Sequence, residues 1–405
     1  MNYRLGTAGR LTLLAIFLTW GVVGVLVRMT VPHFKAAFEL GYRDALLVQS
    51  AFFITYLLFS RAGGAITARV GFRNGAMLGL LLMGIGAFGL AGATFAGEFV
   101  ALLPSIFVLA SGVTFLQVSA NPLAAVEGHL RSASGNLTFA QGFNSLGTVA
   151  APIIAGIAFL GTPDDALEPV RLLFIAVAIF LFALALLARM TLRENDAAQS
   201  PRPEEAGRAF GAVEAKRLRG GVAAIFLYVG AEVAITTTLV NLLEGARELA
   251  LSRDAATALV SLYWLGMLLG RFAAVPLLLR FERQKVLAAV ALSAALLCLV
   301  ASTAGGVGAA AAILAVGLFG GPQFPTIFTI SSADLEPQAR AKAAGWLCTG
   351  IVGGGVVPLF YGEIADRFSL ETALLVPATC FLLIALFALR YGAPLSSGRA
   401  LPDRS

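Results

Sequence analysis

The segment IFLTWG at residues 16–21 recurs 209 positions later as IFLYVG at residues 225–230. Two other sets of residues repeat at nearly the same spacing and in the same order. They are Tyr56 and Gly63 with Tyr263 and Gly270, 207 positions apart, and Gly147, Pro152 and Gly156 with Gly353, Pro358 and Gly362, 206 positions apart. Because three matches share nearly one register, the sequence predicts two copies that run in the same direction, which is a parallel repeat.

The chain around these matches is strongly apolar. Of its 405 residues, 58% are hydrophobic and 13% are charged, and the mean hydropathy is +0.85. A soluble protein carries about twice this charged fraction, so the composition excludes an ordinary cytosolic enzyme. We therefore expect a membrane protein that uses lipid as its solvent, and no enzymatic activity.

Apolar stretches long enough to cross a bilayer recur along the whole chain. Six precede a polar segment, at about 11–31, 45–67, 75–95, 99–125, 137–160 and 170–190. Six follow it, at about 221–243, 256–279, 286–304, 308–331, 343–365 and 371–391. The sequence predicts an all-α membrane protein of twelve transmembrane helices, arranged as two parallel six-helix repeats.

The same pattern predicts the domain boundaries and the orientation. We expect six-helix bundles at 1–192 and 221–392, a cytoplasmic linker at 193–220 and a cytoplasmic tail at 393–405. Of 29 Lys and Arg residues, 21 fall on the side of both termini and the linker, and six on the other side. Basic loops stay in the cytoplasm, so both termini are predicted to lie on the cytoplasmic face of a cell inner membrane.

The sequence gives little support for other partners or for cofactors. The pI is 9.5 and the net charge +6, but no basic stripe interleaves with aromatic residues, so no nucleic-acid partner is expected. Cys298, Cys348 and Cys380 fall in apolar runs without metal-ligand spacing and are predicted to be small core residues. We expect neither a metal site nor an organic cofactor.

One acidic residue falls deep inside an apolar stretch. Glu232 lies about eleven residues into the seventh stretch, roughly 16 Å along a helix, near the membrane midplane. Ionisable groups at that depth are functional candidates, and a proton or Na⁺ could neutralise this carboxylate. The sequence favours an ion-coupling role for Glu232, while a structural pair with Arg271 stays open.

Two arginines also fall within apolar stretches. Arg28 lies about 17 residues into the first, where its side chain could reach the headgroups, pair with a carboxylate or bind an anion. Arg271, in the eighth, could play the same roles. Snorkelling or a structural ion pair is favoured for Arg28, and helix-to-helix pairing for Arg271.

The candidate ligand-binding residues are mostly uncharged. Amides suit sugar hydroxyls because they donate and accept together, although they also bridge packed membrane helices. Trp20 and Tyr228 could stack on a pyranose ring, with core packing as the alternative. The predicted substrate-binding set is Gln117, Asn121, Gln141, Asn144, Gln323, Trp20 and Tyr228.

Several blocks of the sequence together resemble the fucose, galactose and glucose group of sugar and cation symporters in the major facilitator superfamily. The matching blocks include FLTWG at 17–21, SANPLAAVEG at 119–128, LTFAQGFNSLGT at 137–148 and IVGGGVVPL at 351–359. The resemblance implies a central sugar site between two bundles, uptake driven by protons or Na⁺, and a monomer. It implies that Gln117, Asn121, Gln141 and Asn144 face the sugar.

This chain departs from the family pattern at three positions. The fucose and proton symporter has acidic residues where this chain has Arg28 and Gln117, so coupling through those two positions is not expected. In the loop after the second stretch, Ala68 replaces the acidic residue of the superfamily gate motif, so the gate is looser or is held by other contacts.

The sequence thus favours an importer of a hexose or related monosaccharide that works by ion-coupled alternating access. A transporter of an anionic solute such as a sugar acid, using Arg28, is the first alternative. An uncoupled sugar facilitator or sensor is the second.

Overall fold

The structure is a computed structural model that describes residues 5–39, 42–96, 99–127, 130–163, 165–192, 210–245 and 252–391. Every regular element in these ranges is a helix, which confirms the all-α prediction. The first half of the chain forms α1 (Thr7–Met29), α2 (Val31–Ala37), α3 (Tyr42–Ala96), α4 (Phe99–Glu127), α5 (Ala133–Ala158) and α6 (Glu168–Thr191).

The second half contains more breaks. Its elements are α7 (Ala212–Gly245), α8 (Arg253–Arg280), α9 (Arg283–Thr303), α10 (Gly306–Gly320), α11 (Gln323–Ser332), α12 (Pro337–Thr349), the short η3 (Gly350–Val352), α13 (Gly353–Arg367), α14 (Leu370–Ala373) and α15 (Leu375–Tyr391). The tenth predicted stretch is split into α10 and α11 just before Gln323, where Pro322 lacks the amide proton that a continuous helix needs.

The count of crossings agrees with twelve. Ten spans in the described ranges are long and apolar enough to cross a membrane, and one of them, Phe52–Phe95, contains two helices. These two helices meet at Gly71, whose φ of 87° is readily adopted only by glycine. The remaining crossing is α5, which is long enough but too polar to qualify by composition.

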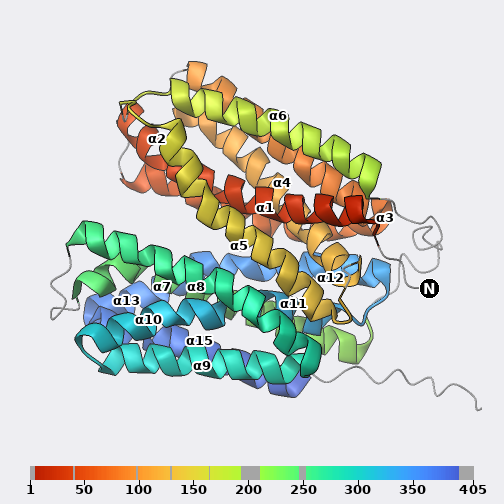
Figure 1. The fold of residues 1–405 in the computed structure, drawn as a ribbon, viewed down its shortest axis with the longest axis vertical. Helices are drawn as coiled ribbons and strands as arrows, with labels where there is room; N and C mark the ends of the chain where they lie inside the picture. The colour runs from red at the N-terminus through yellow and green to blue at the C-terminus, as the bar shows by residue number, and fades with distance from the viewer. Residues whose placement is uncertain are drawn as a thin grey trace, which may run out of the picture.

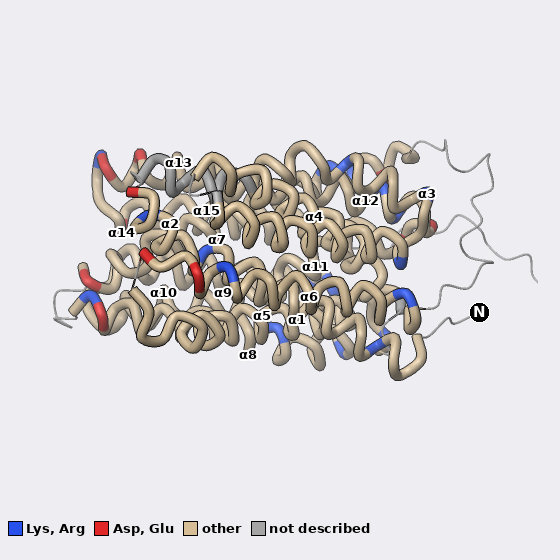
Figure 2. The backbone as a smooth tube through the Cα atoms, turned by 90° about the horizontal axis from the view of Figure 1, so that it is seen from above, with Lys and Arg blue, Asp and Glu red and all other residues tan. Residues whose placement is uncertain are grey.

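The helices lie in two groups that run roughly side by side (Figure 1). Helices α1–α6 form one group and α7–α15 the other, with α5 and α12 at the boundary between them. Charged residues gather at the two ends of the helices and are sparse along the middle (Figure 2). Helix α6 ends at Thr191 and α7 begins at Ala212, inside the predicted linker 193–220. Most of that linker and the predicted tail 393–405 lie outside the described residues, so the boundaries stay a prediction.

Packing shows the internal repeat directly. In the first half, a Cβ atom on Gly147 of α5 would collide with the carbonyl oxygen of Leu18 in α1. In the second half, a Cβ atom on Gly353 would collide with the carbonyl oxygen of Phe226 in α7. The glycines that repeat in the sequence therefore form equivalent close helix crossings, because only glycine lets the backbones approach this far.

The end of the molecule where α1 begins is called the terminal side here. Contacts between helix ends identify the elements that reach this side. They are the first residues of α1, α5, α7, α9 and α12 and the last residues of α8 and α11. The other end is called the far side. The two groups of helices contact each other mainly through α3 with α12 and α5 with α8.

Candidate functional site

The amides predicted from the sequence meet inside the first half. The Gln117 side chain of α4 donates a hydrogen bond to the Tyr56 hydroxyl of α3, and both residues are buried. The Gln141 side chain of α5 donates to Asn121 Oδ1 of α4 at 3.0 Å. Asn144, one turn further along α5, donates to the Phe17 carbonyl of α1 at 3.2 Å. The four amides thus connect α1, α3, α4 and α5.

Several buried polar atoms around these amides have no hydrogen-bond partner in the protein. In the first half they include Asn121 Nδ2 and Thr138 Oγ1, and in the second half Gln323 Oε1. A buried polar group left without a partner is destabilising by about 1–3 kcal/mol. These three atoms therefore lack a partner that a polyhydroxylated ligand or water can supply.

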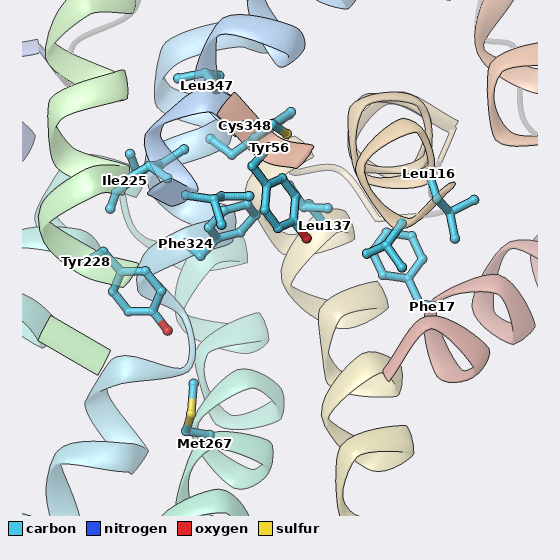
Figure 3. Close-up of a cluster of buried hydrophobic side chains, with 14 of the residues drawn as sticks. Phe17, Tyr56, Leu116, Leu137, Ile225, Tyr228, Met267, Phe324, Leu347 and Cys348 are labelled. Atoms are coloured by element: carbon cyan, nitrogen blue, oxygen red, sulfur yellow. The ribbon is translucent and has the colours of Figure 1, made fainter. Parts of the chain in front are cut away.

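The wall formed by the second half is aromatic. Figure 3 shows Tyr228 of α7 and Tyr56 of α3 on either side of the Phe324 ring of α11, with Met267 of α8 below Tyr228. The rings of Tyr228 and Phe324 have centroids 6.5 Å apart. Trp20 lies in α1, half-buried, with its ring centroid 5.7 Å from that of Phe17. Aromatic faces with polar ends are thus available in both halves.

Arg271 connects the two halves. Its guanidinium is buried and donates from Nη1 to the Gln141 carbonyl at 2.8 Å and to Ser145 Oγ at 2.6 Å, both on α5. Its Nε donates to the Gly321 carbonyl, at the break between α10 and α11, at 3.1 Å. The helix-to-helix role expected for Arg271 is therefore visible, but through carbonyl and hydroxyl groups and not through an ion pair with Glu232.

Glu232 lies one helical turn beyond Tyr228 on α7 and is half-buried. Its electrostatic partners are the Tyr228 hydroxyl, Arg271 of the same half and Arg28 of the other half. None of the ion pairs shorter than 4.0 Å among the described residues includes Glu232. The carboxylate thus faces two arginines without being neutralised by direct contact with either.

Arg28 lies in the last turn of α1 and is solvent-exposed. Its electrostatic partners, Glu232 of α7 and Tyr56 of α3, belong to the interior of the molecule. Arg28 thus interacts electrostatically with groups of both halves, and its snorkelling or ion-pair role stays a prediction.

The gate region contains other contacts in place of the acidic residue that Ala68 replaces. A Cβ atom on Gly64 of α3 would lie 2.8 Å from the Ala341 carbonyl oxygen and 3.0 Å from Gly345 Cα, both on α12. The Arg61 guanidinium lies 4.9 Å from the centre of the Trp346 ring across the same boundary. The gate is thus held by close backbone packing and a cation–π contact.

Some residues of this region were not predicted as functional. Tyr56 and Tyr263 occupy equivalent repeat positions, and both are buried beside charged groups, Arg28 and Glu232 respectively. Their matching positions in the two copies were a signal that could have identified them. Ser134 and Thr329, whose hydroxyls are 2.5 Å apart across the two halves, gave no such signal.

Comparisons with known proteins agree with this architecture. The family model described as Major Facilitator Superfamily matches residues 11–346. The chain belongs to the major facilitator superfamily. It is 34% identical over 387 residues to a glucose/galactose transporter of Brucella abortus. The alignment covers 93% of this chain and 92% of the relative. It is 30% identical to the L-fucose-proton symporter of Escherichia coli, over 93% of this chain and 91% of that protein.

Solved structures show the same fold in this superfamily. The crystal structure of FucP in the outward conformation matches with a TM-score of 0.83 and 26% identity, covering 95% of this chain and 98% of that one. The proton:xylose symporter XylE shares the fold with a TM-score of 0.75 at 16% identity. The twelve-helix, two-repeat architecture expected from the sequence is thereby confirmed.

Proposed function

We propose that this superfamily member imports a neutral monosaccharide together with a proton. Full-length relatives are named as transporters of glucose and galactose and as an L-fucose-proton symporter. The observation that carries the proposal is the set of buried, unpartnered polar atoms contributed by both halves, namely Asn121 Nδ2, Thr138 Oγ1 and Gln323 Oε1.

The chemistry of these atoms suits a sugar. Amide N–H groups and carbonyl oxygens offer donors and acceptors without a net charge, as sugar hydroxyls require. The neighbouring aromatic residues Tyr228 and Phe324 offer an apolar face for the sugar ring. Because the atoms come from both halves, a bound sugar makes contacts that depend on how far apart the halves are.

Glu232 is the proposed proton site. Its electrostatic partners are two arginines and a tyrosine, and they include no second carboxylate. A hard cation such as Na⁺ is held by several oxygen ligands, whereas a proton needs only the carboxylate itself, and the one further oxygen group among the partners is the Tyr228 hydroxyl. This arrangement favours protons over sodium as the coupling ion.

The proposed transport cycle is alternating access between the two bundles, 1–192 and 221–392. Two hydrogen bonds hold the terminal side and the middle of the halves together, one between the Ser134 and Thr329 hydroxyls and one from Arg271 to the Gln141 carbonyl. The similarity to the crystal structure of FucP in the outward conformation supports an outward-facing stage of the cycle for this chain. In this proposal the terminal side is cytoplasmic, because most Lys and Arg residues lie there.

The test is uptake into proteoliposomes from a panel of neutral hexoses, N-acetylhexosamines and sugar acids. Each is offered with a pH gradient, a Na⁺ gradient or no gradient. Concentrative uptake of a neutral sugar under the pH gradient alone is the expected result. Uptake only under a Na⁺ gradient, or only downhill, would refute proton coupling.

Variants test which residues couple the proton and which bind the sugar. Glu232→Gln is expected to abolish proton-driven accumulation while preserving sugar exchange, and Gln141→Leu is expected to abolish both. Glu244→Gln is the matched control, because Glu244 lies on the same helix, where its carboxylate is 3.9 Å from the exposed Arg253. Intact accumulation in Glu232→Gln would contradict the proposed coupling site.

A second candidate function is transport of a sugar acid. It is favoured by the exposed guanidinium of Arg28, which has no carboxylate within 4.0 Å among the described residues. Uptake of acids but not of neutral sugars in the same panel, abolished by Arg28→Gln, would establish this function instead.

A further inference from the structure

Two buried hydroxyl groups differ from all others of their kind in the described residues. The other buried Ser and Thr side chains hydrogen-bond to a carbonyl of their own helix, as Thr114 does to Ala110 at 3.1 Å, or to another side chain. In the described part of the chain, only Ser60 Oγ of α3 and Thr138 Oγ1 of α5 have no partner, and both residues are fully buried. A hydroxyl that bonds to nothing in the protein is available to a group from outside it.

Both residues lie about one helical turn closer to the terminal side than the amides of the candidate site. Ser60 follows Tyr56 by four residues, about 6 Å along α3, and Thr138 precedes Gln141 by three, about 4.5 Å along α5. Tyr56 and Gln141 are the residues of these two helices that hydrogen-bond with the amides of α4. The two hydroxyls therefore lie between the candidate site and the terminal side.

Ser60 belongs to a helix face that meets the second half. A Cβ atom on Gly345 of α12 would lie 2.5 Å from the Ser60 carbonyl oxygen. One turn further along α3, a Cβ atom on Gly64 would lie 2.8 Å from the Ala341 carbonyl oxygen of the same helix α12. The backbone of α12 thus covers this face of α3 from Ser60 to the terminal side.

Thr138 lies between two contacts that join the halves. One turn before it on α5, the Ser134 and Thr329 hydroxyls are 2.5 Å apart, and one turn after it the Gln141 carbonyl accepts a hydrogen bond from Arg271 at 2.8 Å. Positions 134, 138 and 141 share one face of the helix because they are spaced by four and three residues. The second half therefore covers Thr138 as it covers Ser60, and separation of the halves at the terminal side uncovers both.

We propose that Ser60 and Thr138 form a second binding position for the transported sugar, on the terminal side of the first, which is filled when that side opens. The inference rests on the proposed transport of sugar by alternating access, and it places the unpartnered Thr138 hydroxyl at the release stage. A side-chain hydroxyl donates and accepts as a sugar hydroxyl does, so it can replace an amide contact while the sugar moves. Two hydroxyls offer fewer hydrogen bonds than four amides, so the sugar leaves this position more readily.

The same two hydroxyls favour opening of the terminal side. While that side is closed, each hydroxyl is buried without a partner, which destabilises the closed arrangement. When the halves separate, water or the sugar can hydrogen-bond to both groups. Removing either hydroxyl should therefore stabilise the closed terminal side, and should weaken sugar binding only while that side is open.

The test compares sugar affinity with the terminal side open and closed. D-glucose, D-galactose and L-fucose are titrated calorimetrically into the purified full chain. Gly64→Trp prevents closure at α3, because even a Cβ atom there would lie 2.8 Å from the Ala341 carbonyl oxygen. Ser134→Trp prevents closure at α5, because the Ser134 hydroxyl is already 2.5 Å from that of Thr329. Two independent forms with an open terminal side are thereby available.

Each hydroxyl is removed in the open form that is altered on the other helix. Thr138→Val is combined with Gly64→Trp, and Ser60→Ala with Ser134→Trp. Sugar affinity is expected to fall by about threefold to tenfold in both combinations, as for the loss of one hydrogen bond. The same two changes in the otherwise native chain, whose terminal side is closed, should alter the affinity by less than about 1.5-fold.

A distance measurement tests the same hydroxyls without sugar. Spin labels are placed at Val70→Cys and Phe281→Cys, which are exposed positions near the terminal side of opposite halves. In Ser60→Ala and in Thr138→Val, the ratio of closed to open terminal sides should rise about fivefold, because no hydroxyl is then buried without a partner at that position.

Matched controls come from α4 of the same half. The Ser111 and Thr114 hydroxyls are buried but donate to carbonyls of their own helix, those of Phe107 at 2.7 Å and Ala110 at 3.1 Å. Ser111→Ala and Thr114→Val should change neither the distance distribution nor the sugar affinity of the open forms.

The outcomes distinguish this inference from the proposed function. If the native chain neither binds nor transports a neutral sugar, the proposed function fails. If it does both, but removing the hydroxyls weakens affinity equally in the open and closed forms, Ser60 and Thr138 belong to the first position and the second is refuted. A shift in the distance distribution with unchanged affinity would show that the hydroxyls only destabilise the closed side, and would also overturn the second position.

Discussion

The terminal side and the far side of this carrier hold their charges and polar groups in opposite ways. At the terminal side, Ser134 and Thr329 share a hydrogen bond across the halves, and Gly64 and Gly345 pack backbone against backbone. Toward the far side, Arg28 and Glu232 interact electrostatically without an ion pair shorter than 4.0 Å in the described residues. The terminal side is joined by short-range contacts, whereas Arg28 and Glu232 interact only over a longer range.

This difference indicates how one structure can have two stable states. Hydrogen bonds and close packing act only within a few tenths of an ångström of their best geometry, so they stabilise a side that has already closed. An unscreened charge pair acts over several ångströms and can draw an open side together. Removing individual contacts from the terminal side should therefore shift the population toward the state in which that side is open. In each test below, spin labels at Val70→Cys and Phe281→Cys, exposed positions near the terminal side of opposite halves, report the separation.

The largest effect is expected from Arg271→Met. The change removes two hydrogen bonds from a cation to α5, each contributing about 1.5–3 kcal/mol, so the open terminal side should gain about 100-fold or more in population. Sugar transport should be lost as well. Arg280→Met, at the exposed end of the same helix, is the control, and an unchanged distance distribution in Arg271→Met would contradict the bridging role.

Gly64→Ala should act by forcing the two backbones apart. Its Cβ atom would lie 2.8 Å from the Ala341 carbonyl oxygen, and overpacking of this kind is destabilising by about 1–3 kcal/mol. The closed terminal side should lose about tenfold in population while each half stays folded. Gly92→Ala, in the second helix of α3 beyond Gly71, has nothing within 4 Å and should leave the distance unchanged. Equal effects of the two variants would show that helix propensity, and not the gate, is responsible.

Ser134→Ala removes a single hydroxyl contact between the halves. A neutral hydrogen bond contributes about 1 kcal/mol, so a shift of about fivefold toward the open terminal side is expected. A double-mutant cycle with Thr329→Val isolates the pair, since Thr329 also donates to the Pro325 carbonyl of its own helix. Full additivity of the two changes would mean that the contact across the halves contributes nothing.

Arg61→Gln should give the smallest shift. The guanidinium lies over the partly exposed Trp346 ring, and such a contact contributes about 0.5–1 kcal/mol, which corresponds to a change of about two- to fivefold. Arg61→Lys should retain part of the effect, because lysine keeps the charge but not the planar group. A shift in Arg61→Gln as large as that of Arg271→Met would invalidate the ranking of these contacts.

The fold was predictable because its signals are local and repeated. Apolar stretches identify the crossings, and the repeated IFL segment with its glycine identifies the equivalent helices α1 and α7. The sequence identified α5 as the stretch 137–160, although this helix is less apolar than the other crossings because it carries Gln141, Asn144 and Ser145. A ligand-facing helix is necessarily more polar than a lipid-facing one. Hydropathy therefore gives its weakest transmembrane signal for the helix that contributes most to the site.

The candidate site was predictable only in part. Residue type and depth pointed to Gln117, Asn121, Gln141 and Glu232, and the structure pairs Gln117 with Tyr56 and Gln141 with Asn121. The partner of Arg271 could not be predicted. It bonds to a main-chain carbonyl 130 positions away, and every residue has such a carbonyl, so the sequence contains no signal for that contact.

The sequence by itself determined the solvent, the number of crossings, the repeat and the depth of each charge, since these follow from hydropathy and spacing along single helices. Only the tertiary structure decided which side is closed, and that Arg271 bridges the halves while Arg28 and Glu232 stay apart. Those features depend on how two packed bundles are positioned relative to each other. Residues distant in the sequence meet or separate as rigid helices tilt, and no local sequence pattern encodes the tilt of those helices.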